Sequence, residues 1–182
     1  MSWQAHLRQS LNRQPSPPLP DRPPRVAVVG IGQELNGDDA AGVLVARKLQ
    51  QTLKTFETSR VLAIDAGPAP ENCTGLLRRF QPNLVLLVDA ARMDAPPGTI
   101  RWLTWQETTG LSASTHTLPP YLLAQYLEAE LGCEVVLLGL EPAATAPGAS
   151  LSPIVQAAVA EVVKELVKVL DITQSKRRDS VE

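Results

Sequence analysis

Short, continuous apolar runs that alternate with helical patterns constrain this chain most. The apolar runs lie at residues 26–30, 61–65, 84–89 and 134–140, and helical patterns occupy residues 39–49, 71–80, 119–131 and 153–170. This alternation is typical of βαβ units, and uninterrupted apolar runs indicate strands that are buried on both faces. Residues 98–103 alternate in polarity, as in an edge strand. We therefore predict an α/β fold, a three-layer αβα sandwich with a mostly parallel, twisted five-stranded sheet and helices on both faces.

The length and the prolines predict how the chain is divided. The 182 residues, of which 44% are hydrophobic and 20% are charged, suit one domain with a full core. Six of the 16 prolines fall within residues 15–24, and repeated prolines disfavour both helix and sheet. We predict a flexible, proline-rich extension at 1–24, a single domain at 25–171 and a polar tail at 172–182. Trp3, Leu7 and Leu11 have helical spacing, but we expect them to belong to a mobile terminus.

Charge and hydropathy exclude several partners. The net charge of -2 is too close to neutral for the basic surface that nucleic-acid binding requires. No apolar run approaches the ~18 residues that a membrane span needs, and the N-terminus lacks the apolar core of a secretory signal. Cys73 and Cys133 form no CxxC pair and no disulfide framework, so we expect a cytoplasmic protein.

Acidic residues gather where the predicted strands end. In open parallel sheets, ligands bind beyond the carboxyl ends of the strands. Four acids and one histidine fall at these positions: Asp38, Asp39, Asp65, Asp89 and His116. The only other histidine is His6, in the N-terminal extension. Any imidazole chemistry is therefore expected from His116.

Three of these residues form a candidate metal site. Asp39, Asp89 and His116 supply two carboxylates and one imidazole, a set that suits zinc or nickel and leaves coordination positions open. Each also has a purely structural alternative, because Asp is common at helix starts and strand ends and a loop histidine has many uses. One acid of the Asp38–Asp39 pair is enough for a helix cap, which leaves the other free to face the cleft. Asp38 or Asp65 is a candidate general base.

The glycines after the first strand allow a nucleotide-binding alternative. Gly30, Gly32 and Gly37 give G-x-G-x-x-x-x-G, which differs from the dinucleotide fingerprint, and no GK[ST] sequence is present for a P-loop. The two adjacent aspartates would also repel a phosphate at the helix start. The sequence has neither a G-x-S-x-G elbow nor an HExxH motif, so it gives no support to a serine triad or a common zinc protease.

Four segments together resemble the nickel-iron hydrogenase maturation proteases. These are residues 30–42, with the sequence GIGQELNGDDAAG, and residues 65–72, 88–90 and 114–117. The resemblance covers roughly residues 25–170, and the 65–72 block is most similar to the formate-hydrogenlyase-type branch. Ala40 stands where the family commonly has glycine, and the proline-rich extension is outside the family pattern.

The resemblance implies an αβα endopeptidase that removes the C-terminal extension of a hydrogenase large-subunit precursor after nickel insertion. It implies metal contacts at Asp39, Asp89 and His116, and a functional role for Asp65. We expect an aspartyl endopeptidase-like hydrolase whose nickel is carried by the substrate, with resident zinc or another divalent metal as the alternative. The competing hypotheses are a non-enzymatic nickel-handling chaperone and a nucleotide-binding module on the same fold.

Overall fold

The computed structural model describes residues 1–13, 24–56, 58–108 and 119–172. Their helices, strands and 3-10 turns (η) follow one another in this order: α1 (Trp3–Asn12), β1 (Val26–Ile31), η1 (Gly37–Ala40), α2 (Ala41–Thr55), β2 (Val61–Gly67), η2 (Pro70–Cys73), α3 (Thr74–Phe80), β3 (Leu84–Ala90), β4 (Ile100–Thr104), η3 (Trp105–Thr108), α4 (Pro120–Leu131), β5 (Glu134–Leu140) and α5 (Pro153–Val169).

The five strands form one sheet in the order β2-β1-β3-β5-β4. The first four are parallel, and β4 runs antiparallel to β5 at the edge. The predicted mostly parallel sheet and its edge strand are therefore confirmed. The chain leaves β1 for β2 on one side and returns to β3 on the other, so the strand order reverses between β1 and β3. A crevice opens beyond the carboxyl ends of the strands at such a reversal, and ligands bind there in this class of fold.

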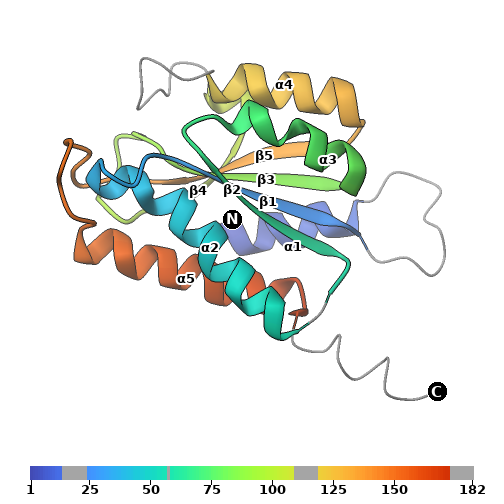
Figure 1. The fold of residues 1–182 in the computed structure, drawn as a ribbon, viewed down its shortest axis with the longest axis horizontal. Coiled ribbons are helices and arrows are strands. Elements are labelled where there is room, and N and C mark those ends of the chain that lie inside the picture. Colours follow the sequence, from blue (N-terminus) through green and yellow to red (C-terminus); the bar gives the residue numbers. More distant parts are fainter. Residues whose placement is uncertain (14–23, 57, 109–118, 173–182) are drawn as a thin grey trace.

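Helices cover both faces of the sheet (Figure 1). Along β1, Val26 and Val28 belong to the apolar core on the side of α2 and α5, whereas Ala27 and Val29 belong to the core on the side of α3 and α4. This alternation between two cores explains why the strands are apolar at nearly every position. The three-layer αβα sandwich is confirmed.

The N-terminal segment differs from our expectation. Residues 3–12 form helix α1, whose Trp3 and Leu7 side chains are buried in the core. The helix packs against α5 and β4, and the His6 ring stacks on Trp102 with 6.1 Å between the ring centroids. The expected flexible extension is therefore wrong for residues 3–12, because the apolar stripe at helical spacing completes the core. The proline-rich residues 14–23 and residues 173–182 lie outside the described part of the chain.

Across the described ranges, none of the helices combines the length and the apolar character needed to cross a membrane.

Candidate functional site

The turn after β1 is built by close backbone packing. A Cβ on Gly30 would lie 2.1 Å from the carbonyl oxygen of Gly42, and one on Gly32 would lie 1.8 Å from that of Asp39. Gly32 also has a φ of +137°, which side chains rarely allow. These glycines let η1 and the start of α2 lie directly against the end of β1. Asp39 is thereby placed at the strand-order reversal.

Asp39 and Asp89 lie beyond or at the carboxyl ends of two neighbouring strands, β1 and β3. Asp39 follows β1 and is half-buried, and its Oδ2 accepts a hydrogen bond from the Gln33 N–H at 2.9 Å. Asp89 is the penultimate residue of β3 and is also half-buried. Burial, and after it the negative charge of Asp39, raise the pKa of Asp89 to about 7 against a weaker opposing effect of the Ala90 N–H. Burial raises the pKa of Asp39 too.

The electrostatics of this pair favour a cation. Two desolvated carboxylates that repel one another are stabilised by a shared proton or by a bound metal ion. His116, the third predicted ligand, lies outside the described residues, and no set of three potential metal-binding side chains gathers within them. Of the predicted set of three, the described part of the chain therefore contains only the two carboxylates, whose oxygens are of the type that hard cations prefer.

Asp38 has quite different surroundings from its neighbour. It is fully buried. Its Oδ2 accepts hydrogen bonds from the N–H groups of Ala143 and Ala144 and from the Ser152 hydroxyl, and its Oδ1 accepts from the Ser152 N–H, at 2.7–3.0 Å. Burial alone would raise the pKa of Asp38, but these hydrogen bonds outweigh it and lower the pKa.

This environment gives Asp38 a structural role. Its hydrogen bonds tie η1 to the segment that joins β5 to α5. Because the residue has no exposed atom, it cannot take a proton from a water molecule bound beside a substrate. The general base that we considered for Asp38 does not fit this geometry. Neither Asp38 nor Asp39 makes a capping hydrogen bond to η1 or α2. The alternative in which one of these two aspartates caps a helix is therefore wrong.

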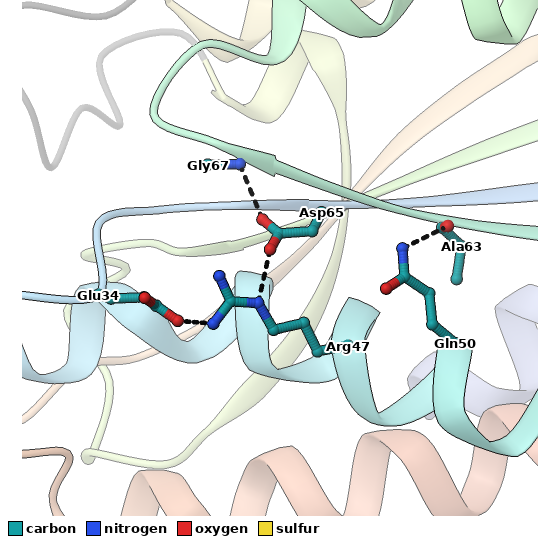
Figure 2. A network of polar contacts seen from close by, with 6 residues as sticks. All are labelled: Glu34, Arg47, Gln50, Ala63, Asp65 and Gly67. Carbon is teal, nitrogen blue, oxygen red and sulfur yellow. Dashed lines mark hydrogen bonds and ion pairs between the residues drawn. The ribbon is translucent and has the colours of Figure 1, made fainter.

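Asp65 lies at the end of β2, on the opposite side of β1 from β3, and belongs to a polar network (Figure 2). Its Oδ2 accepts from Arg47 Nε at 2.6 Å, and its Oδ1 accepts from the Gly67 N–H at 3.2 Å. Arg47 also forms an ion pair with Glu34. Both oxygens of Asp65 thus already accept hydrogen bonds from donors within the protein.

A fifth carboxylate at this edge, that of Glu141, was not among the residues that we predicted from the sequence. It directly follows β5 and is buried, and its Oε2 accepts from the N–H groups of Met93 and Ala95 at 2.6 and 3.3 Å. These contacts hold the loop that follows Asp89. The rule that selected Asp65 and Asp89, an acid at a strand end, would have found Glu141.

The model of the family described as "Hydrogenase maturation protease" matches residues 43–169, more than half of the chain. The chain belongs to the hydrogenase maturation protease family. The match begins after Asp39 and includes Asp65 and Asp89.

Individual members of the family agree in sequence and fold. The hydrogenase 3 maturation protease of Escherichia coli K12 is 34% identical over 113 residues, which cover 62% of this chain and 69% of that protein. The crystal structure of the NiFe hydrogenase maturation protease HycI from Thermococcus kodakarensis has a TM-score of 0.78 at 29% identity, with 91% of this chain and 99% of that one covered. The solution structure of the endopeptidase HycI from Escherichia coli has a TM-score of 0.67 at 28% identity, with 79% and 91% covered.

As a hydrogenase maturation protease, the chain is a peptidase, and its cysteines do not suit nucleophilic catalysis. Both Cys73 and Cys133 are free thiols. Burial raises the pKa of Cys73, and it raises that of Cys133 to about 11. A thiol must ionise to attack a carbonyl group. The two thiols are therefore poor candidates for a nucleophile.

Proposed function

We propose that this protein is the endopeptidase that removes the C-terminal extension of a NiFe hydrogenase large-subunit precursor after nickel insertion. The observation that carries the proposal is the pair formed by Asp39 and Asp89 at the strand-order reversal of a maturation-protease fold. The resemblance of the 65–72 block favours the formate-hydrogenlyase-type branch.

In this proposal the nickel belongs to the substrate. A nickel-loaded precursor brings a cation that relieves the repulsion between Asp39 and Asp89, and His116 is the third contact. A precursor without nickel offers no such relief and binds more weakly. The metal thus serves as the signal that the substrate is ready, and the geometry that it imposes places the scissile bond in the crevice.

Peptide hydrolysis then needs water to attack the scissile carbonyl carbon, a base to take the water proton, and a proton for the leaving amine. Among the candidates from the sequence, Asp65 is the more accessible, since Asp38 is fully buried. Its ion pair with Arg47 must loosen before it can accept a proton. Asp65 is therefore expected to contribute less to the rate than the Asp39–Asp89 pair.

A processing assay tests the proposal. Large-subunit precursor, with and without nickel, is incubated with the wild type, with Asp39→Asn, Asp89→Asn or His116→Ala, and with Asp171→Asn as a control at an exposed acid after α5. Cleavage is followed by gel mobility. We expect only the nickel-loaded precursor to be cut, and only by the wild type and the control.

The other outcomes point to the alternatives. Cleavage of the unloaded precursor that depends on added zinc and stops with a chelator would indicate a resident catalytic metal. Nickel binding to the protein without cleavage of any precursor would indicate a nickel-handling chaperone. Full activity of Asp39→Asn would show that the carboxylate pair is not the functional site.

A further inference from the structure

Arg47 joins three parts of the molecule near the site. It lies on α2, and its guanidinium contacts Asp65 at the end of β2 and Glu34 in the loop between β1 and η1 (Figure 2). Guanidinium nitrogens in a planar fork can hold two carboxylates in a fixed relative position, which a lysine ammonium does not do. Arg47 therefore links the loop to the neighbouring strand from the side of α2.

A continuous set of contacts leads from this ion pair to Asp39. Asp65 accepts from the Gly67 N–H, and the carbonyl oxygen of Gly67 accepts from the Gly32 N–H at 3.0 Å. The backbone of Gly32 packs directly against that of Asp39. The next residue, Gln33, donates its N–H to Asp39 Oδ2 at 2.9 Å. The loop held by Arg47 is thus the loop that orients the Asp39 carboxylate.

The rest of this loop has an anchor that does not involve Arg47. The carbonyl oxygen of Leu35 accepts from the Gly148 N–H at 2.6 Å, which ties the loop to the segment before α5. The side of the loop that faces β2 is held through Glu34 and through Gly32. Loss of Arg47 would consequently free one side of the loop and leave the other attached.

Global stability does not account for the outer part of this arrangement. The side chains of Arg47 and Glu34 are 43% and 47% exposed, and exposed ion pairs contribute little to the free energy of unfolding. The local effect is larger, because a short loop between two fixed elements depends on few contacts.

We propose that Arg47 is a positioning residue of the peptidase, which clamps the β1–η1 loop to the end of β2 and so orients Asp39 toward the metal of the substrate. This inference rests on the proposed function for its catalytic consequence. Its structural part, the orientation of the loop, concerns the protein alone.

The structural part is tested by amide hydrogen exchange, measured by NMR on the full chain without substrate. Arg47→Met keeps the aliphatic stem and removes the guanidinium. Arg78→Met is the matched control, because Arg78 forms a similar exposed ion pair with Glu130 between α3 and α4. We expect the amides of Gly32 and Gln33 to exchange faster in Arg47→Met, and at the wild-type rate in Arg78→Met. Unchanged exchange in Arg47→Met would overturn the inference.

The catalytic part is tested with nickel-loaded precursor. We expect Arg47→Met to lower kcat/KM by about 10-fold to 100-fold, as displaced catalytic groups do, with a Tm no lower than that of Arg78→Met. Arg47→Lys should recover part of the loss. A fall in activity that only follows the folded fraction, with KM and exchange unchanged, would show a merely structural role. If the wild type cuts no precursor, the proposed function fails, and the exchange data still decide whether Arg47 orients the loop.

Glu34→Gln keeps the inference testable if Arg47→Met does not fold. It removes one carboxylate of the clamp and leaves the Arg47–Asp65 ion pair in place. We expect an intermediate increase in the exchange rate of Gln33 and a smaller loss of kcat/KM. Wild-type behaviour in both measurements would contradict a clamp that acts through Glu34.

Discussion

Burial, together with the negative charge of Asp39, raises the pKa of Asp89 to about 7, although Asp39 lies in η1 after β1 and Asp89 lies in β3. In the absence of a cation, each carboxylate makes it costlier for the other to ionise. The site therefore opposes the folding that creates it, as is common where groups are arranged for function. A bound cation reverses this effect.

Replacement of Asp89 should stabilise the metal-free protein at alkaline pH. Because the folded pKa of about 7 exceeds the ordinary value of 3.8, the folded state binds more protons than the unfolded state between these values. The free energy of unfolding from this group therefore falls as the pH rises through that window, by roughly 2–4 kcal/mol in total. Asp89→Asn removes this loss, and urea unfolding near pH 5 and near pH 8 in a chelator measures it.

The quantity to compare is the difference in the free energy of unfolding between wild type and Asp89→Asn at the two pH values, since other groups titrate in both proteins. For Asp171→Asn, which changes an exposed acid, the corresponding difference from wild type should change little between the two pH values. A variant that is equally destabilised at both pH values would mean that Asp89 is a structural residue with satisfied hydrogen bonds. The same variant should be inactive in precursor cleavage.

Asp38→Asn should have the opposite effect on stability. The carboxylate accepts four hydrogen bonds, whereas an asparagine offers one acceptor oxygen and turns an NH₂ group toward N–H donors. We expect a loss of about 2–4 kcal/mol in the free energy of unfolding. Because the folded pKa of Asp38 is lowered, the stabilisation by the wild-type group is present above the ordinary pKa and disappears as the pH falls through the folded value.

Activity separates the two neighbouring aspartates. At a temperature where Asp38→Asn is folded, its cleavage rate per folded molecule should be close to that of the wild type, whereas Asp39→Asn should be folded and inactive. Circular dichroism gives the folded fraction and the gel assay gives the rate. A stable but inactive Asp38→Asn would return Asp38 to the list of catalytic candidates.

Much of the fold can be predicted from the sequence because burial on both faces leaves a strong local signal. The run Glu134–Leu140 is identical to the predicted strand, and Ile100–Thr104 is the predicted edge strand within two residues. The strand order has no such signal, since it depends on which apolar faces meet in three dimensions. For the same reason, we expected the segment that forms helix α1 to be mobile. The spacing of Trp3 and Leu7 indicates a helix, but only the packing shows that these side chains are buried.

The site was predictable in position and less so in the role of each residue. The strand-end rule placed Asp39, Asp65 and Asp89 at the carboxyl edge of the sheet, where the structure also places them. The partners of Asp38 are more than 100 residues away in the chain, so no local pattern distinguishes its role from that of Asp39. Arg47 lies in the middle of α2, and its contact with Asp65 can be recognised only when α2 is packed beside β2.

Leu7→Ala should show that α1 is an integral part of the domain. Leu7 is fully buried in the core shared with α5, so its truncation leaves a cavity and should lower the free energy of unfolding by about 2–5 kcal/mol. Urea unfolding with an m-value like that of the wild type is expected. Leu76→Ala, at an exposed leucine of α3, is the control and should change stability little. A Leu7→Ala protein as stable as the control would mean that α1 is not docked in solution.

Gly32→Ala should disrupt the site through backbone contact. The new Cβ would lie 1.8 Å from the carbonyl oxygen of Asp39, at a φ of +137°, so the loop or η1 must move.

Gly132→Ala separates the contact from the strain of a positive φ. Gly132 ends α4 with a φ of +63° and has open space around its Cβ position, so its substitution should cost only about 1 kcal/mol and leave cleavage unchanged. Gly32→Ala should lose more stability than this and should lose precursor cleavage even where it is folded, because Asp39 is displaced from Asp89. Equal stability and equal activity of the two variants would mean that the β1–η1 turn does not set the geometry of the carboxylate pair.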